Sequence, residues 1–252
     1  MENISEPVIE VRGLDVGYKD IVIMHNLNFS VSKGDIFVIM GVSGSGKSTL
    51  LKTVIGLNEP IKGQVLYGGR DFWAEDDMGR QAIMRSFGVL YQGGALWSSL
   101  TLGENIALVL QLYTDLSAKQ IDELVSLKLS LVGLGGYENY YPSEISGGMC
   151  KRAGLARAIA LDPGIIFFDE PSAGLDPVNA HMLDELIIEL RDILGATIVI
   201  VTHELASIFA VATNSVFLDV ETKTIIAQGN PKELLAHSGI PKVIHFLTRG
   251  RK

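Results

Sequence analysis

The segment from Gly41 to Thr49 carries the most specific chemistry of this sequence. It matches the pattern G-x-x-x-x-G-K-[ST] with an additional internal glycine, and it lies between an apolar run and a stretch of helical periodicity. Glycines let backbone N–H groups surround phosphate oxygens, and the N-terminus of the following helix adds positive potential. We therefore expect a nucleoside triphosphate to bind here, held by Gly41, Ser43, Gly44, Gly46, Lys47, Ser48 and Thr49.

Two carboxylates complete a hydrolytic set. Asp169 and Glu170 follow the apolar run 165–168. In enzymes with such a phosphate loop, the lysine (here Lys47) reaches the β and γ phosphates and the hydroxyl of Ser48 binds Mg²⁺. We expect Asp169 to complete the Mg²⁺ shell through water and Glu170 to act as general base toward an attacking water. Alone, this acidic pair would read as a solvated turn, but the phosphate loop favours the catalytic interpretation.

An α/β domain with a mainly parallel sheet is expected to position these residues, because short apolar runs alternate with helical segments. The expected strands are 36–40, 88–91, 165–168 and 197–201, and the expected helices are 47–56, 178–194 and 205–213. Three of the strands are continuously apolar, which is typical of strands covered on both faces. Residues 8–16 and 21–31 are predicted to pair as an N-terminal antiparallel β subdomain.

We expect one domain over residues 1–252. Residues 1–94 and 162–240 would form the α/β core with its β subdomain, and 241–252 a C-terminal tail. The stretch 95–161 is predicted to be an inserted helical subdomain. Thr101 with Glu104 and Ser117 with Gln120 are candidate capping boxes within it.

Composition restricts the function further. The chain has 29 acidic and 21 basic residues and a net charge of −8, which argues against nucleic acid as the main ligand. No strictly apolar run exceeds five residues, so we expect no segment to span a bilayer. The single cysteine, Cys150, cannot form an internal disulfide.

Residues 143–152 discriminate among proteins with a phosphate loop. Ser146, Gly147 and Gly148 form a turn that opens a helix predicted over 149–161. In isolation this is a serine-capped helix. In this order after Lys47 and before Asp169, it resembles the signature motif of ABC-type ATPases, which implies a P-loop NTPase core.

Further residues match that family. Gln92 resembles the glutamine that contacts Mg²⁺ and water and couples to the partner, and His203 resembles the switch histidine that contacts the γ phosphate. Residues 172–176, ending in Asp176, resemble the D-loop. Tyr18 is placed like the aromatic residue that stacks on adenine. Taken singly, these residues could be strand ends, a helix cap and a strand aromatic.

The resemblance implies a dimer. In this family two domains sandwich two ATP molecules, with the phosphate loop of one chain facing the signature of the other. This chain has one of each, so it needs a second copy or a related subunit. The expected cofactors are ATP and Mg²⁺. A separate membrane permease would dock near Gln92, where Trp97 and Leu100 follow in an apolar loop.

Details of the motifs point to one branch of the family. Ile145 and Met149 replace the usual leucine and glutamine of the signature. Ser-Gly-Gly-Met followed by basic residues, together with the segment after Gln92, is similar to the Mla/Mce-type lipid-transport ATPases. That similarity implies a homodimer at the cytoplasmic face of the inner membrane, beneath an MlaE-type permease. An MCE-domain lipid carrier and a small STAS-domain protein are further expected partners.

Three alternatives stay open. The first is the ATPase of a polar-solute importer or exporter. The second is a soluble ABC protein of DNA repair or translation, which the acidic net charge and the chain length disfavour. The third is a nucleotide-gated scaffold without turnover, which the presence of Glu170 and His203 disfavours.

Overall fold

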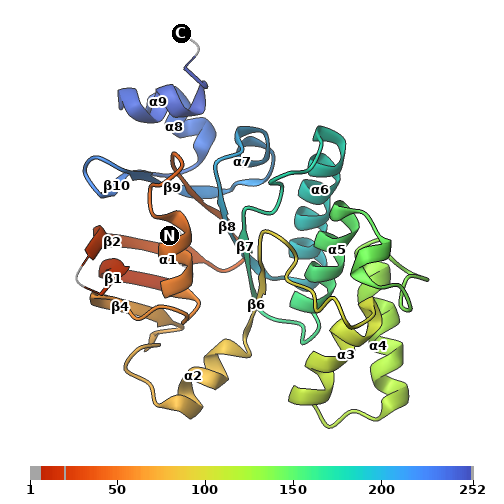
Figure 1. The fold of residues 1–252 in the computed structure, drawn as a ribbon. Helices are drawn as coiled ribbons and strands as arrows, with labels where there is room; N and C mark the ends of the chain where they lie inside the picture. Colours follow the sequence, from red (N-terminus) through yellow and green to blue (C-terminus); the bar gives the residue numbers. More distant parts are fainter. Residues whose placement is uncertain (1–6, 20, 251–252) are drawn as a thin grey trace, which may run out of the picture.

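The strands of this protein form two sheets. A computed structural model describes residues 7–19 and 21–250 (Figure 1). The larger sheet has the order β10-β9-β3-β8-β7-β6, and its neighbours are parallel except for the antiparallel pair β9 and β10. The strands are β3 (Ile36–Met40), β6 (Phe87–Leu90), β7 (Ile165–Asp169), β8 (Thr197–Thr202), β9 (Asn214–Asp219) and β10 (Thr224–Gln228). The predicted mainly parallel α/β sheet is confirmed.

The smaller sheet is antiparallel and has the order β2-β1-β4-β5. It comprises β1 (Pro7–Tyr18), β2 (Ile21–Ser32), β4 (Lys62–Tyr67) and β5 (Arg70–Asp71). The predicted N-terminal antiparallel piece is confirmed by β1 and β2. The two later strands were not anticipated, because their apolar run (Val65 to Tyr67) is too short to stand out.

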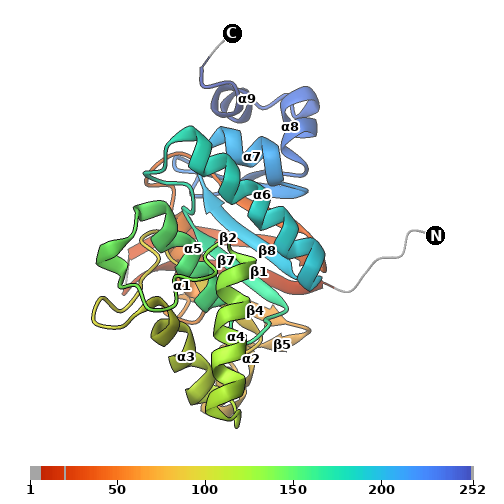
Figure 2. The same ribbon diagram turned by 90° about the vertical axis from the view of Figure 1, so that its right-hand side faces the viewer.

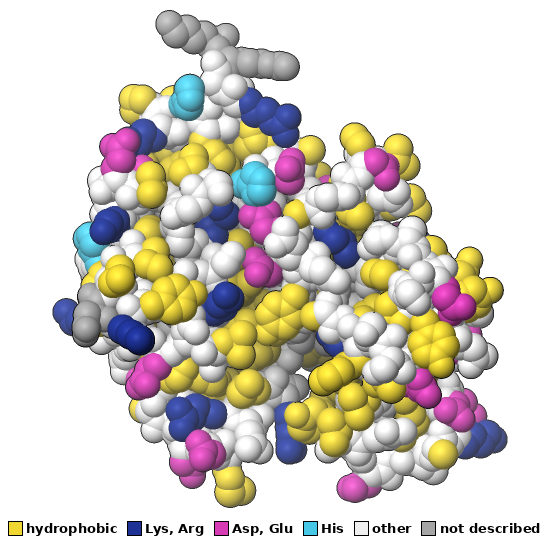
Figure 3. Space-filling model, in the orientation of Figure 1, with side chains coloured by type: hydrophobic (Ala, Val, Ile, Leu, Met, Phe, Trp, Pro, Cys, Tyr) yellow, Lys and Arg dark blue, Asp and Glu magenta, His cyan; other side chains and the backbone are white. Residues whose placement is uncertain are grey.

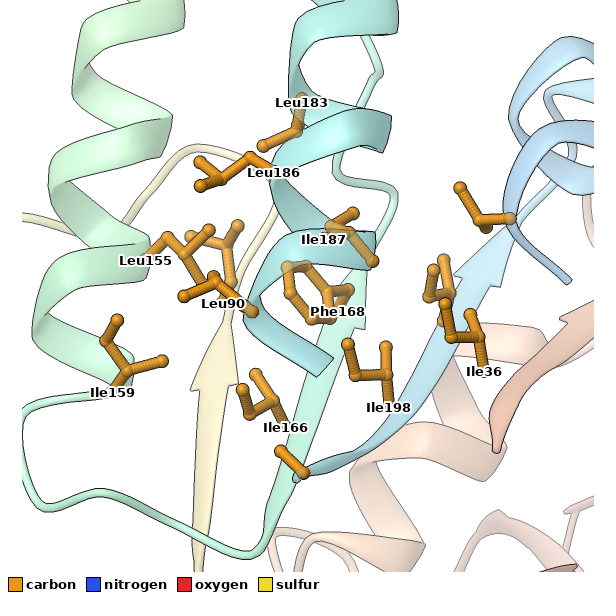
Figure 4. Packing of buried hydrophobic residues seen from close by; sticks show 14 of the residues in the cluster. Ile36, Leu90, Leu155, Ile159, Ile166, Phe168, Leu183, Leu186, Ile187 and Ile198 are labelled. Carbon is orange, nitrogen blue, oxygen red and sulfur yellow. The ribbon is translucent and has the colours of Figure 1, made fainter. Parts of the chain in front are cut away.

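The larger sheet separates two hydrophobic cores. Side chains alternate across a strand, so Phe167 of β7 packs with the smaller sheet and Phe168 packs with the helices on the other face. Both rings are fully buried. Figure 4 shows the second core, in which residues of β7 meet Leu155 of α5, Ile159 directly after that helix and Ile187 of α6. Burial on both faces explains why these strands are continuously apolar.

Nine α-helices complete the part of the chain that the structure describes. They are α1 (Lys47–Val54), α2 (Asp77–Met84), α3 (Leu102–Tyr113), α4 (Ala118–Leu131), α5 (Gly147–Ala158), α6 (Pro177–Leu194), α7 (Leu205–Val211), α8 (Pro231–His237) and α9 (Pro241–Leu247). A 3-10 turn, Pro142–Glu144, precedes α5. Helices α3, α4 and α5 gather on the side of the larger sheet away from β1 and β2, as Figures 1 and 2 show.

Local signals explain several helix ends. Thr101 and Glu104 form the predicted capping box at α3, and the Gln120 side chain accepts hydrogen bonds from the backbone and hydroxyl of Ser117 at α4. The helix predicted over 149–161 begins two residues earlier, because the Ser146 hydroxyl accepts from the Met149 N–H at 3.3 Å and caps it.

The C-terminal segment, expected as a tail, contains a helix. Residues 241–247 form α9, which buries Val243 and Leu247. Lys242 joins this helix to Asp219 of β9 through an ion pair of 2.9 Å. Residues 251–252 of the expected tail lie outside the described residues. Within 7–19 and 21–250, no helix combines the length and apolar character needed to cross a membrane.

Candidate functional site

The phosphate loop joins β3 to α1, as its motif predicts. Gly46, directly before α1, has φ of +85°, in the left-handed region that favours glycine. A Cβ at this position would come within 2.9 Å of the Ile23 side chain and 2.8 Å of the Met24 side chain, both in β2. Gly46 therefore lets the loop turn sharply while it packs against the smaller sheet.

Lys47 is buried at the start of α1, with its side chain folded over the loop. Its Nζ donates hydrogen bonds to the carbonyl oxygens of Gly41 and Val42, each at 3.0 Å. Burial lowers the pKa of the ammonium, and the carboxylates of Glu170 and Asp169 oppose that shift. The cation is thus held at the loop by carbonyl oxygens, which an anionic phosphate can replace as partners.

Ser48 and Asp169 meet beside the loop. The Ser48 hydroxyl lies 3.4 Å from Oδ1 of Asp169, at the carboxyl end of β7. Burial raises the pKa of Asp169, and the hydrogen bond from Ser48 opposes that rise. A hydroxyl and a carboxylate are hard oxygen donors of the kind that Mg²⁺ prefers, and Mg²⁺ sites commonly take one or two carboxylates plus water and phosphate. The residues present therefore fit the ion that the motif implies.

Glu170 and His203 form a second pair. The Nδ1 atom of His203 lies 2.8 Å from Oε1 of Glu170. The other carboxylate oxygen, Oε2, is buried and has no hydrogen-bond partner among the described residues. Glu170 has φ of +48°, a sparsely populated conformation for a residue with a side chain, and its N–H donates to the carbonyl oxygen of Val201 at 2.8 Å.

One cavity of about 410 Å³ brings these groups together. It is lined by Ile23, Ser43, Gly44, Gly46, Lys47, Ser48, Thr49, Gln92, Glu170 and His203. Gln92 and His203, which are 111 positions apart (203 − 92), share this wall with the phosphate loop. The cavity combines a cation, amide and hydroxyl donors, and a carboxylate, so it can bind a triphosphate and accept a proton from water.

Three of the expected nucleotide and metal residues, Tyr18, Gly41 and Asp169, are not part of the cavity lining. Tyr18 is 47% exposed, and the nearby Thr49 side chain lowers the Tyr18 pKa. Ile23 of β2 lies on the cavity wall instead. No sequence signal marked Ile23, since an isoleucine in a strand ordinarily reads as a packing residue.

The signature residues lie apart from this cavity. Ser146 caps α5, Gly147 and Gly148 form its first turn, and none of the three lines the cavity of their own chain. Gly148 lies near the N-terminus of α6, where a Cβ would be 3.6 Å from the Asn179 side chain. Asp176 caps α6 by accepting from the N–H groups of Val178 and Asn179, and its hydrogen bonds with Asn179 lower its pKa.

A larger groove of about 480 Å³ lies elsewhere, between α2, β6, α3 and α5. Its lining is mainly apolar, with Arg85 and Arg157 as the charged members. Figure 3 shows hydrophobic side chains around the hollow that separates α2 from α3. The groove contains no carboxylate or nucleophile, so the hydrolytic chemistry is assigned to the smaller cavity.

Comparisons with known proteins agree with this geometry. The ABC transporter family profile matches residues 24–173. The chain is 42% identical to the "Probable ribonucleotide transport ATP-binding protein mkl" of Mycobacterium leprae, over 97% of this chain and 69% of that protein. It is 37% identical to the "Intermembrane phospholipid transport system ATP-binding protein MlaF" of Haemophilus influenzae, over 96% of this chain and 91% of that protein.

Solved structures are also similar. The dimeric ATP-binding cassette MJ0796, described in a post-hydrolysis state with ADP and Pi, superposes with a TM-score of 0.80 and 27% identity, over 88% of this chain and 98% of that chain. The CbiO1 protein of Clostridium perfringens gives a TM-score of 0.83 and 26% identity, over 96% and 95%. The similarities predicted from the motifs, to ABC ATPases and to Mla-type proteins, are confirmed.

Proposed function

The chain belongs to the ABC transporter family, and we propose that it is the ATP-hydrolysing subunit of a transporter for phospholipid or other hydrophobic cargo in the bacterial envelope. As a member of this family it binds and hydrolyses ATP and works with a membrane permease. The observation that carries the proposal is the single cavity that joins the phosphate loop to Glu170 and His203.

In the proposed mechanism each residue has one task. Lys47 exchanges its two carbonyl partners for phosphate oxygens, and the loop N–H groups hold the remaining ones. Ser48, Asp169 (through water) and Gln92 would hold Mg²⁺, which neutralises phosphate charge when bound. Glu170 takes the proton of the attacking water, while His203 fixes Oε1 of that carboxylate and would reach the γ phosphate. Tyr18 and Thr49 remain proposed contacts of the nucleotide.

A homodimer completes the site. Because Ser146, Gly147 and Gly148 lie outside the cavity of their own chain, they are available to a nucleotide held by a second chain. The N-terminus of α5 would then close the γ-phosphate side, with Asp176 at the neighbouring D-loop. The ABC transporter cassette MJ0796, a structural relative, is described as dimeric, which supports a dimer here.

The division into subdomains follows from this arrangement. We assign residues 1–94 and 162–240 to the core, 95–161 to the helical subdomain, and 241–252 to the C-terminal segment, so that the phosphate loop and signature belong to different parts of the chain. A hinge between these parts would let ATP binding in the dimer change the width of the groove between them.

We propose that a cytoplasmic helix of the permease binds in that groove. Arg157 lines it and donates to the carbonyl oxygens of Gly94 and Ala95, two and three residues after Gln92. A helix in the groove would therefore press on the Gln92 loop. Trp97 is 61% exposed and Leu100 half-buried, but neither lines the groove; they remain candidate contacts at its margin.

The cargo proposal rests on the Mla-type relatives, which this chain matches over 91% of their length. It places the chain at the cytoplasmic face of the inner membrane with an MlaE-like permease, an MCE-domain carrier and a STAS-domain protein. A polar-solute transporter is the second candidate, because a relative at 42% identity is named for ribonucleotide transport. No nucleic acid is proposed as a ligand, given the net charge of −8.

Affinity purification of the full chain in mild detergent tests the assembly. We expect a polytopic permease together with an MCE-domain protein. Recovery with ribosomes or DNA would overturn the transport proposal, whereas a permease accompanied by a solute-binding protein would favour the polar-solute alternative.

A further inference from the structure

Lys151 of α5 is a buried cation that the site described above does not use. Its side chain is 7% exposed, although lysine is rarely buried without compensation. Its Nζ donates to the carbonyl oxygen of Pro171 at 2.7 Å and to that of Ala173 at 2.5 Å. Burial lowers the pKa of this ammonium, and the Glu170 carboxylate opposes that shift. The cation is thus stabilised by the loop that directly follows Glu170.

Few other hydrogen bonds hold the loop at residues 171–175. Its backbone bonds are those from the Ala173 N–H to the Glu170 carbonyl at 3.2 Å and from the Leu175 N–H to the Ser172 carbonyl at 3.1 Å. The Ser172 hydroxyl is buried and has no partner among the described residues. Over residues 171–175, within the part of the chain that the structure describes, Lys151 supplies the side-chain hydrogen bonds that hold the backbone.

Lys151 also lies between the signature residues and the loop that follows Glu170. It is one helical turn after the signature residues, on the helix that Ser146 caps. The loop it holds begins at Glu170 and ends at Asp176, which caps α6. A displacement of α5 therefore acts through this ammonium group, as well as through the contact of Gly148 with Leu175, on the segment that orients Glu170.

We infer that Lys151 is a positioning residue that couples the signature helix to Glu170 of the same chain. This inference rests on the proposed function, in which the signature contacts the nucleotide of the partner subunit. When that contact sets the position of α5, Lys151 sets the loop at 171–173 and aligns the Glu170 carboxylate in its own cavity. Each chain thereby links the binding of nucleotide by its partner to hydrolysis of the nucleotide that it binds itself.

Lys151→Met tests this coupling in the purified transporter complex, because it removes the ammonium and retains most of the side-chain volume. A misaligned base lowers turnover without weakening phosphate binding, so we expect kcat to fall about tenfold or more and KM to stay within about twofold. Lys151→Arg retains the charge and N–H donors that can reach the carbonyl oxygens, and we expect it to recover kcat to within about threefold of the wild type.

Lys128→Met is the matched control. Lys128 of α4 is also buried, at 2% exposure, but its ammonium pairs with Asp162 and does not contact the loop. Both substitutions should lower the melting temperature, whereas only the Lys151 change should lower kcat. Equal kcat in wild type and Lys151→Met, or an equal loss in Lys128→Met, overturns the coupling.

If Lys151→Met does not fold, Lys151→Gln, which retains a shorter donor, is measured in its place with the same expected split. A wild-type complex that hydrolyses no ATP would instead contradict the proposed function itself. The two failures are therefore distinguishable.

Discussion

His203 and Glu170 meet at 2.8 Å across the carboxyl ends of two neighbouring parallel strands, β7 and β8. The left-handed backbone of Glu170 and its hydrogen bond to Val201 orient the carboxylate toward the histidine. One carboxylate oxygen is engaged, and the other is buried without a partner among the described residues. A carboxylate fixed in this way can act as a base at the cavity wall that also carries Lys47.

Glu170→Gln should trap the closed dimer, because the amide retains the shape of the carboxylate and cannot take a proton from water. We expect ATP to shift the variant from monomer to dimer in size-exclusion chromatography. A variant that stays monomeric at saturating ATP would contradict the shared site.

Lys47→Ala should abolish hydrolysis, since it removes the only cation that lines the cavity among the described residues. A loss of about a hundredfold or more in ATP turnover is expected from the missing phosphate contact. Lys33→Ala, at an exposed position before β3, is the control and should retain activity. Wild-type turnover in Lys47→Ala would show that the site lies elsewhere.

Tyr113→Ala should weaken attachment to the permease. Tyr113 lines the groove, is 50% exposed, and has the guanidinium of Arg85 5.2 Å above its ring. Truncation of an aromatic residue that anchors an interface commonly weakens binding by about 2 kcal/mol or more. The Kd for the permease should therefore rise roughly thirtyfold, and less permease should be recovered with the variant. Leu112→Ala, the adjacent residue outside the groove, should leave the recovery unchanged, and an equal loss there would argue against docking in the groove.

Asp184→Asn should stabilise the protein at neutral pH. Asp184 of α6 is buried, and burial raises its pKa, although a hydrogen bond with Ser207 opposes the rise. A carboxyl group with a higher pKa in the folded state destabilises that state once the pH exceeds its ordinary value, and is neutral below it. The melting temperature of the variant should therefore be about 2–4 °C above that of the wild type near pH 7, and equal to that of the wild type near pH 3.

Thermal unfolding at both pH values measures this effect. Glu189→Gln, at an exposed position of the same helix, should change little. An Asp184→Asn protein that is less stable at pH 7 would mean that Ser207 stabilises the carboxylate by more than its burial costs.

Motifs with strict local geometry were predictable from the sequence. These motifs depend on a few consecutive residues. The structure places the phosphate loop between β3 and α1, Asp169 at the end of β7, His203 directly after β8 and the cap at Thr101 before α3. The positions of Lys151 and Ile23 were not predictable, because a lysine on a helix usually faces solvent and an isoleucine in a strand usually packs. Their positions depend on contacts between segments far apart in the chain, Lys151 with Pro171 and Ile23 with Gly46.

Transfer of a fluorescent phospholipid by the purified complex in proteoliposomes most directly tests the proposed function. We predict movement that requires ATP in the wild type and is absent in the Glu170→Gln complex, with no uptake of labelled ribonucleotide by either. ATP-dependent ribonucleotide uptake without lipid movement would contradict the assignment of a hydrophobic cargo.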